Sequence, residues 1–320
     1  MTWLQLHIDT DPASVDRIEN ALTEAGAVSV TLQDNADQPV LEPGVGETPL
    51  WDATRLTALF SDSFTPQDII KQLGRSLGQP PTNYRFESLE DQDWERSWLD
   101  NFTPLRFGNN LWVCPSWQQA PDPDAVVIAL DPGLAFGTGT HQTTALCLEW
   151  LEQAELTNKV IIDYGCGSGI LAIAALLLGA KSAICVDNDP QALIATRANA
   201  TQNGIDEASL AVCLPEQLEQ TLNDIARSEA IATSETSAKS KNRDIHNGFD
   251  LVIANILAGP LITLAPQLSG LMAPNGELVL SGILDIQAEQ VMQAYNSKVN
   301  FSPMAKRDEW VRLNGRTLFT

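Results

Sequence analysis

The chain has 320 residues, of which 44% are hydrophobic, and carries a formal net charge of −22 from 41 acidic and 19 basic side chains. The length suggests two domains, and the hydrophobic content excludes a disordered chain. The negative charge repels phosphate backbones and attracts basic partners, so it counts against a nucleic-acid substrate, although acidity can also serve solubility alone.

The cysteines and apolar segments bear on compartment and metals. The five cysteines form no C-x-x-C pair and no histidine cluster accompanies them, so the sequence predicts neither a zinc site nor a disulfide framework. An odd number of thiols fits a reducing compartment. The nearest candidate for a membrane span, Ile170 to Ala180, is too short, and the first residues do not resemble a signal peptide. We expect a cytoplasmic, soluble protein without a metal or membrane partner.

Residues 1–89 are predicted to form a small α+β domain of the ferredoxin-like type. Period-two apolar patterns indicate strands, and capping residues followed by proline indicate helix starts. The resulting order is β-α-β-β-α-β. The expected strands are 3–8, 28–32, 55–60 and 84–89, and the helices begin at Asp11-Pro12 and Thr65-Pro66. No residue pattern here suggests chemistry, so we expect this domain to recognise a substrate.

Residues 90–125 are interpreted as a linker. The segment 90–102 is charged and aromatic with helical spacing, which predicts a connecting helix whose tryptophans pack against a domain; a tryptophan-lined binding face is the alternative. Short strands are expected near Leu105 and at 111–114, before a strand at 126–130 opens the last domain.

Residues 126–320 alternate continuous apolar strands with amphipathic helices, which predicts a doubly wound parallel sheet covered on both faces. The expected strands are 160–164, 183–186, 210–214, 249–254 and 277–281, and the helices are 170–178, 190–203, 257–272 and 286–295. Near the end, Asn314-Gly315 between apolar-polar runs predicts an antiparallel hairpin. The polar segment 216–247 lacks periodicity and is expected to be an inserted, mobile surface loop.

A glycine-rich turn, Asp163-Tyr164-Gly165-Cys166-Gly167-Ser168-Gly169, lies between a predicted strand and helix. Glycines allow a sharp turn and close approach to a ligand, and the helix start presents free amides. A dinucleotide fingerprint would need glycine at position 170, where the chain has Ile170. The acid-x-G-x-G-x-G spacing resembles the methyltransferase version, which cradles the methionine part of S-adenosylmethionine through residues such as Gly165 and Gly167.

Asp187 ends the next predicted strand and is the expected ribose ligand. A carboxylate there can accept hydrogen bonds from both ribose hydroxyls. The structural alternative is that Asp189 caps the helix begun by Pro190 while Asp187 merely ends the strand. Capping suits Asp189, so the ribose is assigned to Asp187.

Asn255 follows the strand 249–254, whose carboxyl end faces the transferred methyl group in folds of this kind. Enzymes that methylate planar nitrogens usually place Pro-Pro-aromatic after this residue, and the chain has Ile256-Leu257-Ala258 instead. The stacking platform for a flipped base is therefore missing, which favours a flexible amine such as lysine. The alternative is that Asn255 only caps the next helix.

The segment 130–144 is rich in glycine and threonine and has the sequence L-D-P-G-L-A-F-G-T-G-T-H-Q-T-T. Ordering such a segment costs much conformational entropy, so we expect it to have a function beyond connecting two elements. It can fold over a cofactor, with Phe136 excluding water. His141 is a candidate general base because its ordinary pKa is near neutrality. It can equally cap the following helix or stabilise the loop, and the sequence favours neither role.

Three motifs carry a family resemblance: the loop 130–144, the glycine-rich turn 163–169, and the segment N-I-L-A-G-P that begins at Asn255. Together they resemble the family of methyltransferases that modify large-subunit ribosomal protein eleven, over residues 3–320. The resemblance implies a class I methyltransferase fold with a terminal antiparallel hairpin, joined through a mobile linker to an N-terminal recognition domain. It implies S-adenosylmethionine as methyl donor, a basic ribosomal protein as partner, and trimethylation of α-amine and lysine nitrogens. Cofactor contacts carried over by position are Thr144, Gly165, Asp187 and Asn255. The long 216–247 segment departs from the family pattern.

Overall fold

The computed structural model describes residues 3–36, 38, 48–89, 103–131, 139, 141–235 and 248–318, with no side-chain description for 228–235. The chain forms two compact units, Met1–Asn101 and Phe102–Thr320, which have separate hydrophobic cores. The division at 89 and 125 expected from the sequence stays a prediction. The connecting helix expected at 90–102 lies outside the described residues.

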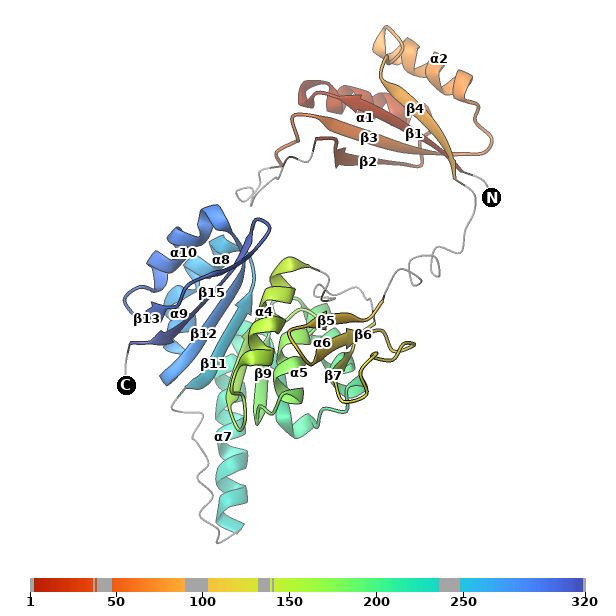
Figure 1. The fold of residues 1–320 in the computed structure, drawn as a ribbon. Helices are drawn as coiled ribbons and strands as arrows, with labels where there is room; N and C mark the ends of the chain where they lie inside the picture. Colours follow the sequence, from red (N-terminus) through yellow and green to blue (C-terminus); the bar gives the residue numbers. More distant parts are fainter. Residues whose placement is uncertain are drawn as a thin grey trace. The chain divides into compact units, whose positions relative to one another are not determined.

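In the N-terminal unit, two helices pack against one face of an antiparallel sheet with the order β2-β3-β1-β4 (Figure 1). The elements are β1 (Trp3–Thr10), α1 (Val15–Glu24), β2 (Ser29–Asp34), β3 (Thr54–Ser61), α2 (Pro66–Leu77) and β4 (Tyr84–Leu89). The predicted β-α-β-β-α-β order is confirmed. Thr65 caps α2 by accepting a hydrogen bond from the backbone N–H of Asp68 at 3.2 Å, as the Thr-Pro pair indicated. Strands β2 and β4 form the two edges of this sheet.

The C-terminal unit is built on a twisted sheet with the order β10-β9-β8-β11-β12-β15-β13, in which β14 also pairs with β15. Strands β8 to β12 run parallel, and β13, β14 and β15 make antiparallel pairs. The doubly wound sheet with an antiparallel end is therefore confirmed. The strands are β8 (Val160–Tyr164), β9 (Ser182–Val186), β10 (Leu210–Cys213), β11 (Phe249–Asn255), β12 (Met272–Leu284), β13 (Val299–Phe301), β14 (Ala305–Arg307) and β15 (Trp310–Thr317).

Helices cover both faces of this sheet (Figure 1). One hydrophobic cluster joins α4 and α5 to the strands, and a second joins α8, α9 and α10 to the opposite face. The helices are α4 (Gln142–Gln153), α5 (Ile170–Leu177), α6 (Pro190–Gln202), α8 (Ala258–Thr263), α9 (Ala265–Gly270) and α10 (Ala288–Tyr295). Within the described ranges, no helix is long and apolar enough to cross a membrane.

A small sheet of β5 (Leu105–Phe107), β6 (Leu111–Cys114) and β7 (Val126–Ala129) packs on the α4 and α5 side. Its buried residues Phe107, Leu111 and Ile128 belong to the same hydrophobic cluster as α4 and α5. The short strands expected at 105 and 111–114 are therefore present, and they share a core with the larger sheet.

The hairpin expected at Asn314-Gly315 is wrong in its position. Both residues lie inside β15, where Asn314 pairs with Val279 and Gly315 pairs with Leu278. A Cβ at Gly315 would come within 2.6 Å of the carbonyl oxygen of Asn300 on β13. Glycine is thus needed for close strand packing rather than for a turn. The reversal lies at residues 308–309 instead, between the paired residues Arg307 and Trp310.

The segment 216–247 was expected to be a loop, and its first part is a helix. α7 spans Leu218–Glu235 after a single 3-10 turn, Pro215–Gln217. Leu218, Leu222 and Ile225 repeat at helical spacing and pack against the cluster of α8 to α10. This short apolar stripe is outnumbered by polar residues, which hid it from the sequence reading. Residues 236–247 lie outside the described parts.

Candidate active site

The glycine-rich turn joins β8 to α5 at the carboxyl edge of the sheet. Gly165, Gly167 and Gly169 have φ values of 80°, 54° and 77°, a region that residues with a Cβ rarely adopt. The backbone N–H groups of Gly165 and Cys166 donate to the carbonyl oxygen of Val186 at 2.7 and 3.1 Å. The turn lies between a strand and a helix, as predicted, and these bonds fasten it to the end of β9.

Asp187 fixes this turn with its own carboxylate. Its Oδ2 accepts from the backbone N–H of Gly167 at 2.8 Å, and its Oδ1 accepts from the backbone N–H of Asp189 at 3.0 Å. Asp189 caps α6 by accepting from the N–H of Gln191 at 2.9 Å, as expected. Asp187 therefore has a structural task that the sequence reasoning overlooked, in addition to its place at the predicted ribose position.

Asn255 is the last residue of β11, and Thr144 on α4 holds its side chain. The Asn255 amide nitrogen Nδ2 donates to Thr144 Oγ1 at 3.3 Å, while Thr144 itself is fully buried. Within the described residues, the amide oxygen Oδ1 of Asn255 is buried without a hydrogen-bond partner. A buried acceptor without a donor is costly, and it fits a ligand that brings an N–H group.

The loop after Asn255 is clamped between two glycines. A Cβ on Gly165 would overlap the Cγ2 atom of Ile256, and a Cβ on Gly282 would lie 2.7 Å from the Ile256 carbonyl carbon. Gly282 belongs to β12 and has a φ of 82°. Both glycines are needed for Ile256 to lie where it does, so they set the path of the chain immediately after Asn255.

His141 caps α4 and contacts an aromatic side chain from the far end of the sheet. Its Nδ1 lies 2.8 Å from Thr143 Oγ1 and accepts from the Thr143 N–H at 3.4 Å. The His141 ring meets the Trp310 ring edge-on, with centroids 4.9 Å apart. Burial lowers the pKa of His141, so the imidazole is neutral at neutral pH. The capping role expected as one alternative is present.

These elements enclose a cavity of about 790 Å³. Of the predicted site residues, His141, Gly165, Gly167, Asp187 and Asn255 line it, whereas Thr144 lies behind Asn255 and is absent from the wall. Phe136 and Thr138 fall outside the described residues. The remaining wall comes from Thr143, Tyr164, Asn188, Pro215, Ile256, Leu257, Pro260, Leu264, Gly282 and Trp310.

Comparison with known proteins identifies the family. Residues 2–317 match the family described as ribosomal protein L11 methyltransferase (PrmA). The chain belongs to this family. Curated members from Pseudomonas paraeruginosa (strain DSM 24068 / PA7) and Cellvibrio japonicus (strain Ueda107) are 50% identical over 316 residues and 49% identical over 313 residues, covering 99% and 98% of both chains. A crystal structure of a ribosomal protein L11 methylase from Lactobacillus delbrueckii subsp. bulgaricus is 32% identical with a TM-score of 0.53, covering 67% of this chain and 98% of that one.

The cavity of this methyltransferase fits S-adenosylmethionine, the methyl donor of class I enzymes. A Cβ on Gly165 would clash with Ile256, and a Cβ on Gly169 would clash with Thr196, so only glycine fits at these two positions of the turn. Asp187 lines the cavity at the position predicted for the ribose, and its carboxylate oxygens can accept further hydrogen bonds beside those from the Gly167 and Asp189 backbone. Carboxylate acceptors of this kind suit the hydroxyl donors of the cofactor.

Replacing Asp187 with alanine is expected to weaken cofactor binding by roughly 10- to 100-fold, because hydrogen bonds to a charged group contribute about 1.5–3 kcal/mol. The variant loses the predicted ribose contact together with the bond that holds the Gly167 N–H. Calorimetric titration of the methyltransferase with S-adenosylhomocysteine measures the loss. Asp189→Ala removes only the α6 cap and is the matched control. Equal affinities for Asp187→Ala and this control would contradict the assignment.

The raised pKa of Asp163 leads us to expect a specific pH dependence of the free energy of unfolding. Burial raises the pKa of Asp163 to about 7, the backbone N–H of Ala172 opposes this by donating to Oδ2, and the charge of Asp187 raises it further. Between the ordinary value of 3.8 and about 7, the folded chain holds a proton that the unfolded chain has released. Stability therefore falls with rising pH in this window, by up to about 1.4 kcal/mol per pH unit.

The Asp163→Asn variant should lack this contribution. Urea unfolding of the cofactor-free protein, followed at several pH values across the window, is expected to show the variant gaining stability relative to the wild type as the pH rises. Above about pH 7 the difference should become constant, because the carboxyl is then ionised in both states. Parallel curves for the two proteins throughout the window would show that Asp163 does not titrate in it.

Several wall residues of this methyltransferase escaped the sequence analysis. Trp310 and Gly282 come from β15 and β12, and the antiparallel placement of β15 brings Trp310 beside Leu284 at the carboxyl edge of the sheet. No local pattern marks either residue as part of a site. Tyr164 could have been found, because it lies inside the glycine motif, and its hydroxyl accepts from Gln267 at 3.3 Å.

Proposed function

We propose that this methyltransferase transfers methyl groups from S-adenosylmethionine to amines of ribosomal protein L11, at lysine side chains and the N-terminal α-amine. The observation that supports an amine most directly is the Oδ1 of Asn255 at the end of β11, which is buried and has no partner in the part of the chain that the structure describes. Thr144 fixes the orientation of that amide from behind. The apolar residues that follow, Ile256 and Leu257, provide no aromatic platform for a nucleobase.

S-adenosylmethionine, when bound, supplies a methyl group made electrophilic by its sulfonium. The residues of the chain then have to present an amine lone pair in line with that methyl group. A lysine amine with an ordinary pKa of about 10.4 must lose its proton first, whereas an α-amine near ~7.7 is partly neutral already. The apolar wall of the cavity disfavours the ammonium form, and Asn255 Oδ1 accepts one N–H of the neutral amine.

His141 is the candidate for accepting the proton, and water is the alternative. Its ring is neutral at neutral pH because burial lowers its pKa, so it has the correct form for a base. Its Nδ1 is engaged with Thr143, and its ring lines the cavity. If water takes the proton instead, His141→Asn should retain the wild-type profile of turnover against pH.

We assign recognition of the substrate to residues 1–89, linked to the catalytic residues 126–320 through 90–125. The relatives at 49–50% identity match the chain over nearly their whole length, so the N-terminal unit belongs to what the family shares. The net charge of −22 favours a basic protein and disfavours direct binding of nucleic acid. The five cysteines are free and buried, which supports a reducing, cytoplasmic setting.

The test is incubation of the full chain with labelled S-adenosylmethionine and purified ribosomal protein L11, with naked ribosomal RNA in a parallel reaction. We expect label on the protein alone, and mass spectrometry should place it on lysine and α-amine nitrogens. Label on the RNA, or none on ribosomal protein L11, would contradict the proposal.

A further inference from the structure

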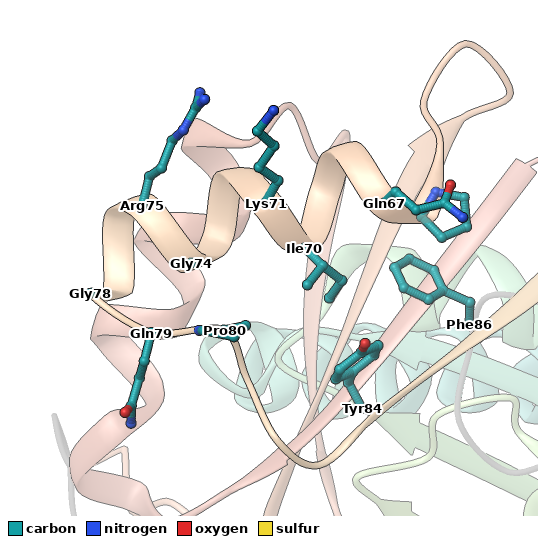
Figure 2. A pocket seen from close by; sticks show the side chains of 11 residues that line it. Gln67, Ile70, Lys71, Gly74, Arg75, Gly78, Gln79, Pro80, Tyr84 and Phe86 are labelled. Atoms are coloured by element: carbon teal, nitrogen blue, oxygen red, sulfur yellow. The ribbon is translucent and has the colours of Figure 1, made fainter.

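The N-terminal unit carries a cavity of about 610 Å³ between α2 and the edge strand β4 (Figure 2). Its volume lies in the range of sites that bind small molecules or inserted side chains. Ile70 on α2 turns toward Tyr84 and Phe86 on β4, and the two rings pack edge to face with centroids 5.9 Å apart. Tyr84 is 42% exposed, so the apolar floor is open to solvent. An open aromatic hollow of this kind favours an apolar partner group.

The rim of this cavity is basic in an otherwise acidic unit. Residues 1–89 contain 13 acidic and 5 basic side chains, counted from the sequence. Two of the five, Lys71 and Arg75, line the cavity, and none of the acidic residues that the structure describes lines it. They are exposed and lie one helical turn apart on α2, with their charged ends directed outward (Figure 2). A carboxylate on the partner would complement this pair.

The strand beside the cavity offers a backbone edge. β4 pairs with β1 on one side and forms the end of the described sheet on the other. The N–H and C=O groups on the outer side of an edge strand can bind an additional strand. Peptides commonly bind in this way, where main-chain hydrogen bonds give affinity and a side-chain pocket gives specificity.

We infer that the groove between α2 and β4 docks an extended segment of the protein substrate. The segment lies along β4, inserts an apolar side chain between Ile70, Tyr84 and Phe86, and places a carboxylate beside Lys71 and Arg75. This inference rests on the proposed function, because it takes ribosomal protein L11 as the occupant. The remaining acidic surface of the unit attracts a basic partner at long range. The basic rim selects one acidic residue of the docked segment and so sets the register of that segment along β4.

Gly74 provides a way to close the groove without damaging the fold. It lies inside α2 with an ordinary helical φ, and a Cβ there would meet Pro80 of the cavity wall at 3.5–3.7 Å, which is normal contact. Leucine at this position fills the groove, and replacing a helical glycine also favours the helix. Gly74→Ala adds a single methyl group and is the matched control.

The experiment measures methylation of ribosomal protein L11 by the full chain and its Gly74→Leu and Lys71→Ala/Arg75→Ala variants. We expect KM for the protein to rise about 30-fold, the loss typical of an interface hot spot, with kcat and affinity for S-adenosylhomocysteine unchanged. Gly74→Ala, and Arg17→Ala on the exposed face of α1, should keep the wild-type KM. Thermal unfolding should show Gly74→Leu folded at least as stably as the wild type.

Wild-type KM in both groove variants would overturn the docking surface and leave the proposed function standing. Loss of ribosomal RNA binding in Lys71→Ala/Arg75→Ala, with KM for the protein unchanged, would also overturn it, because the groove would then bind a phosphate backbone. A wild-type chain that fails to methylate ribosomal protein L11 would refute the proposed function and this inference together.

Discussion

Asn255→Ala is expected to reduce kcat for methylation of ribosomal protein L11 by roughly 100- to 1,000-fold, the loss seen when one preorganised hydrogen-bonding group is removed from a reacting centre. The amide oxygen of Asn255 is buried and unpartnered among the described residues, so it is held ready for an N–H group of the incoming amine. Single-turnover rates measured with saturating substrate separate this effect from binding. Affinity for S-adenosylhomocysteine should change much less than the rate.

The hydrogen bond between Thr144 and Asn255 provides control variants for this prediction. Thr144→Val removes the hydroxyl that accepts from Asn255 Nδ2 at 3.3 Å and frees the amide to rotate. We expect a loss of about tenfold, in line with a misaligned hydrogen-bond partner, and recovery in Thr144→Ser, which restores the hydroxyl. Wild-type rates in Asn255→Ala would show that the amine is oriented by other groups. A loss equal in Thr144→Ser and Thr144→Val would point to packing.

Three of the site residues that the sequence predicted share one property. Gly165, Asp187 and Asn255 each lie at the carboxyl end of a strand of the parallel sheet, and parallel strands bring these ends to one edge. Local patterns identify such strands well, because each is a short apolar run between turn signals. Their convergence on one cavity therefore follows from chain order alone, without knowledge of any side-chain contact.

The residues that were missed depend on the antiparallel end of the sheet. Trp310 reaches the cavity wall because β15 pairs between β12 and β13. In the sequence it lies 55 or more residues after β11, so only the pairing of the strands brings Trp310 near the end of β11. Asn314-Gly315 has the composition of a turn, yet both residues pair with neighbouring strands. Tertiary packing decided against the local turn propensity, and the true reversal at Asp308-Glu309 carries a weaker signal.

The helix α7 shows the opposite error. Leu218, Leu222 and Ile225 form a short apolar stripe in a long, mostly polar segment, so the segment resembles an unstructured insertion. In the structure these three side chains pack in the apolar cluster of α8 to α10, and that packing stabilises the helix. A pattern that is too sparse to predict a helix alone is sufficient when a partner surface is present.

Gly282→Ala is expected to destabilise the fold by roughly 2–5 kcal/mol and to reduce kcat at least about 100-fold, since it combines a left-handed backbone with an overpacked contact close to the reacting centre. Gly282 has a φ of 82°, and a Cβ there would lie 2.7 Å from the carbonyl carbon of Ile256. The backbone after Asn255 would have to move, and Asn255 would move with it. Urea unfolding and single-turnover rates measure the two effects.

A second glycine tests whether the path of this loop is the cause. A Cβ on Gly165 would strike the side chain of Ile256, at Cγ2, whereas a Cβ on Gly282 strikes its backbone. Adding Ile256→Ala should therefore recover part of the turnover lost in Gly165→Ala and none of that lost in Gly282→Ala. Gly270→Ala, on α9 in open space, should match the wild type in both measurements. Recovery of turnover in Gly282→Ala/Ile256→Ala, or none in Gly165→Ala/Ile256→Ala, would contradict this account of how the two glycines position the loop after Asn255.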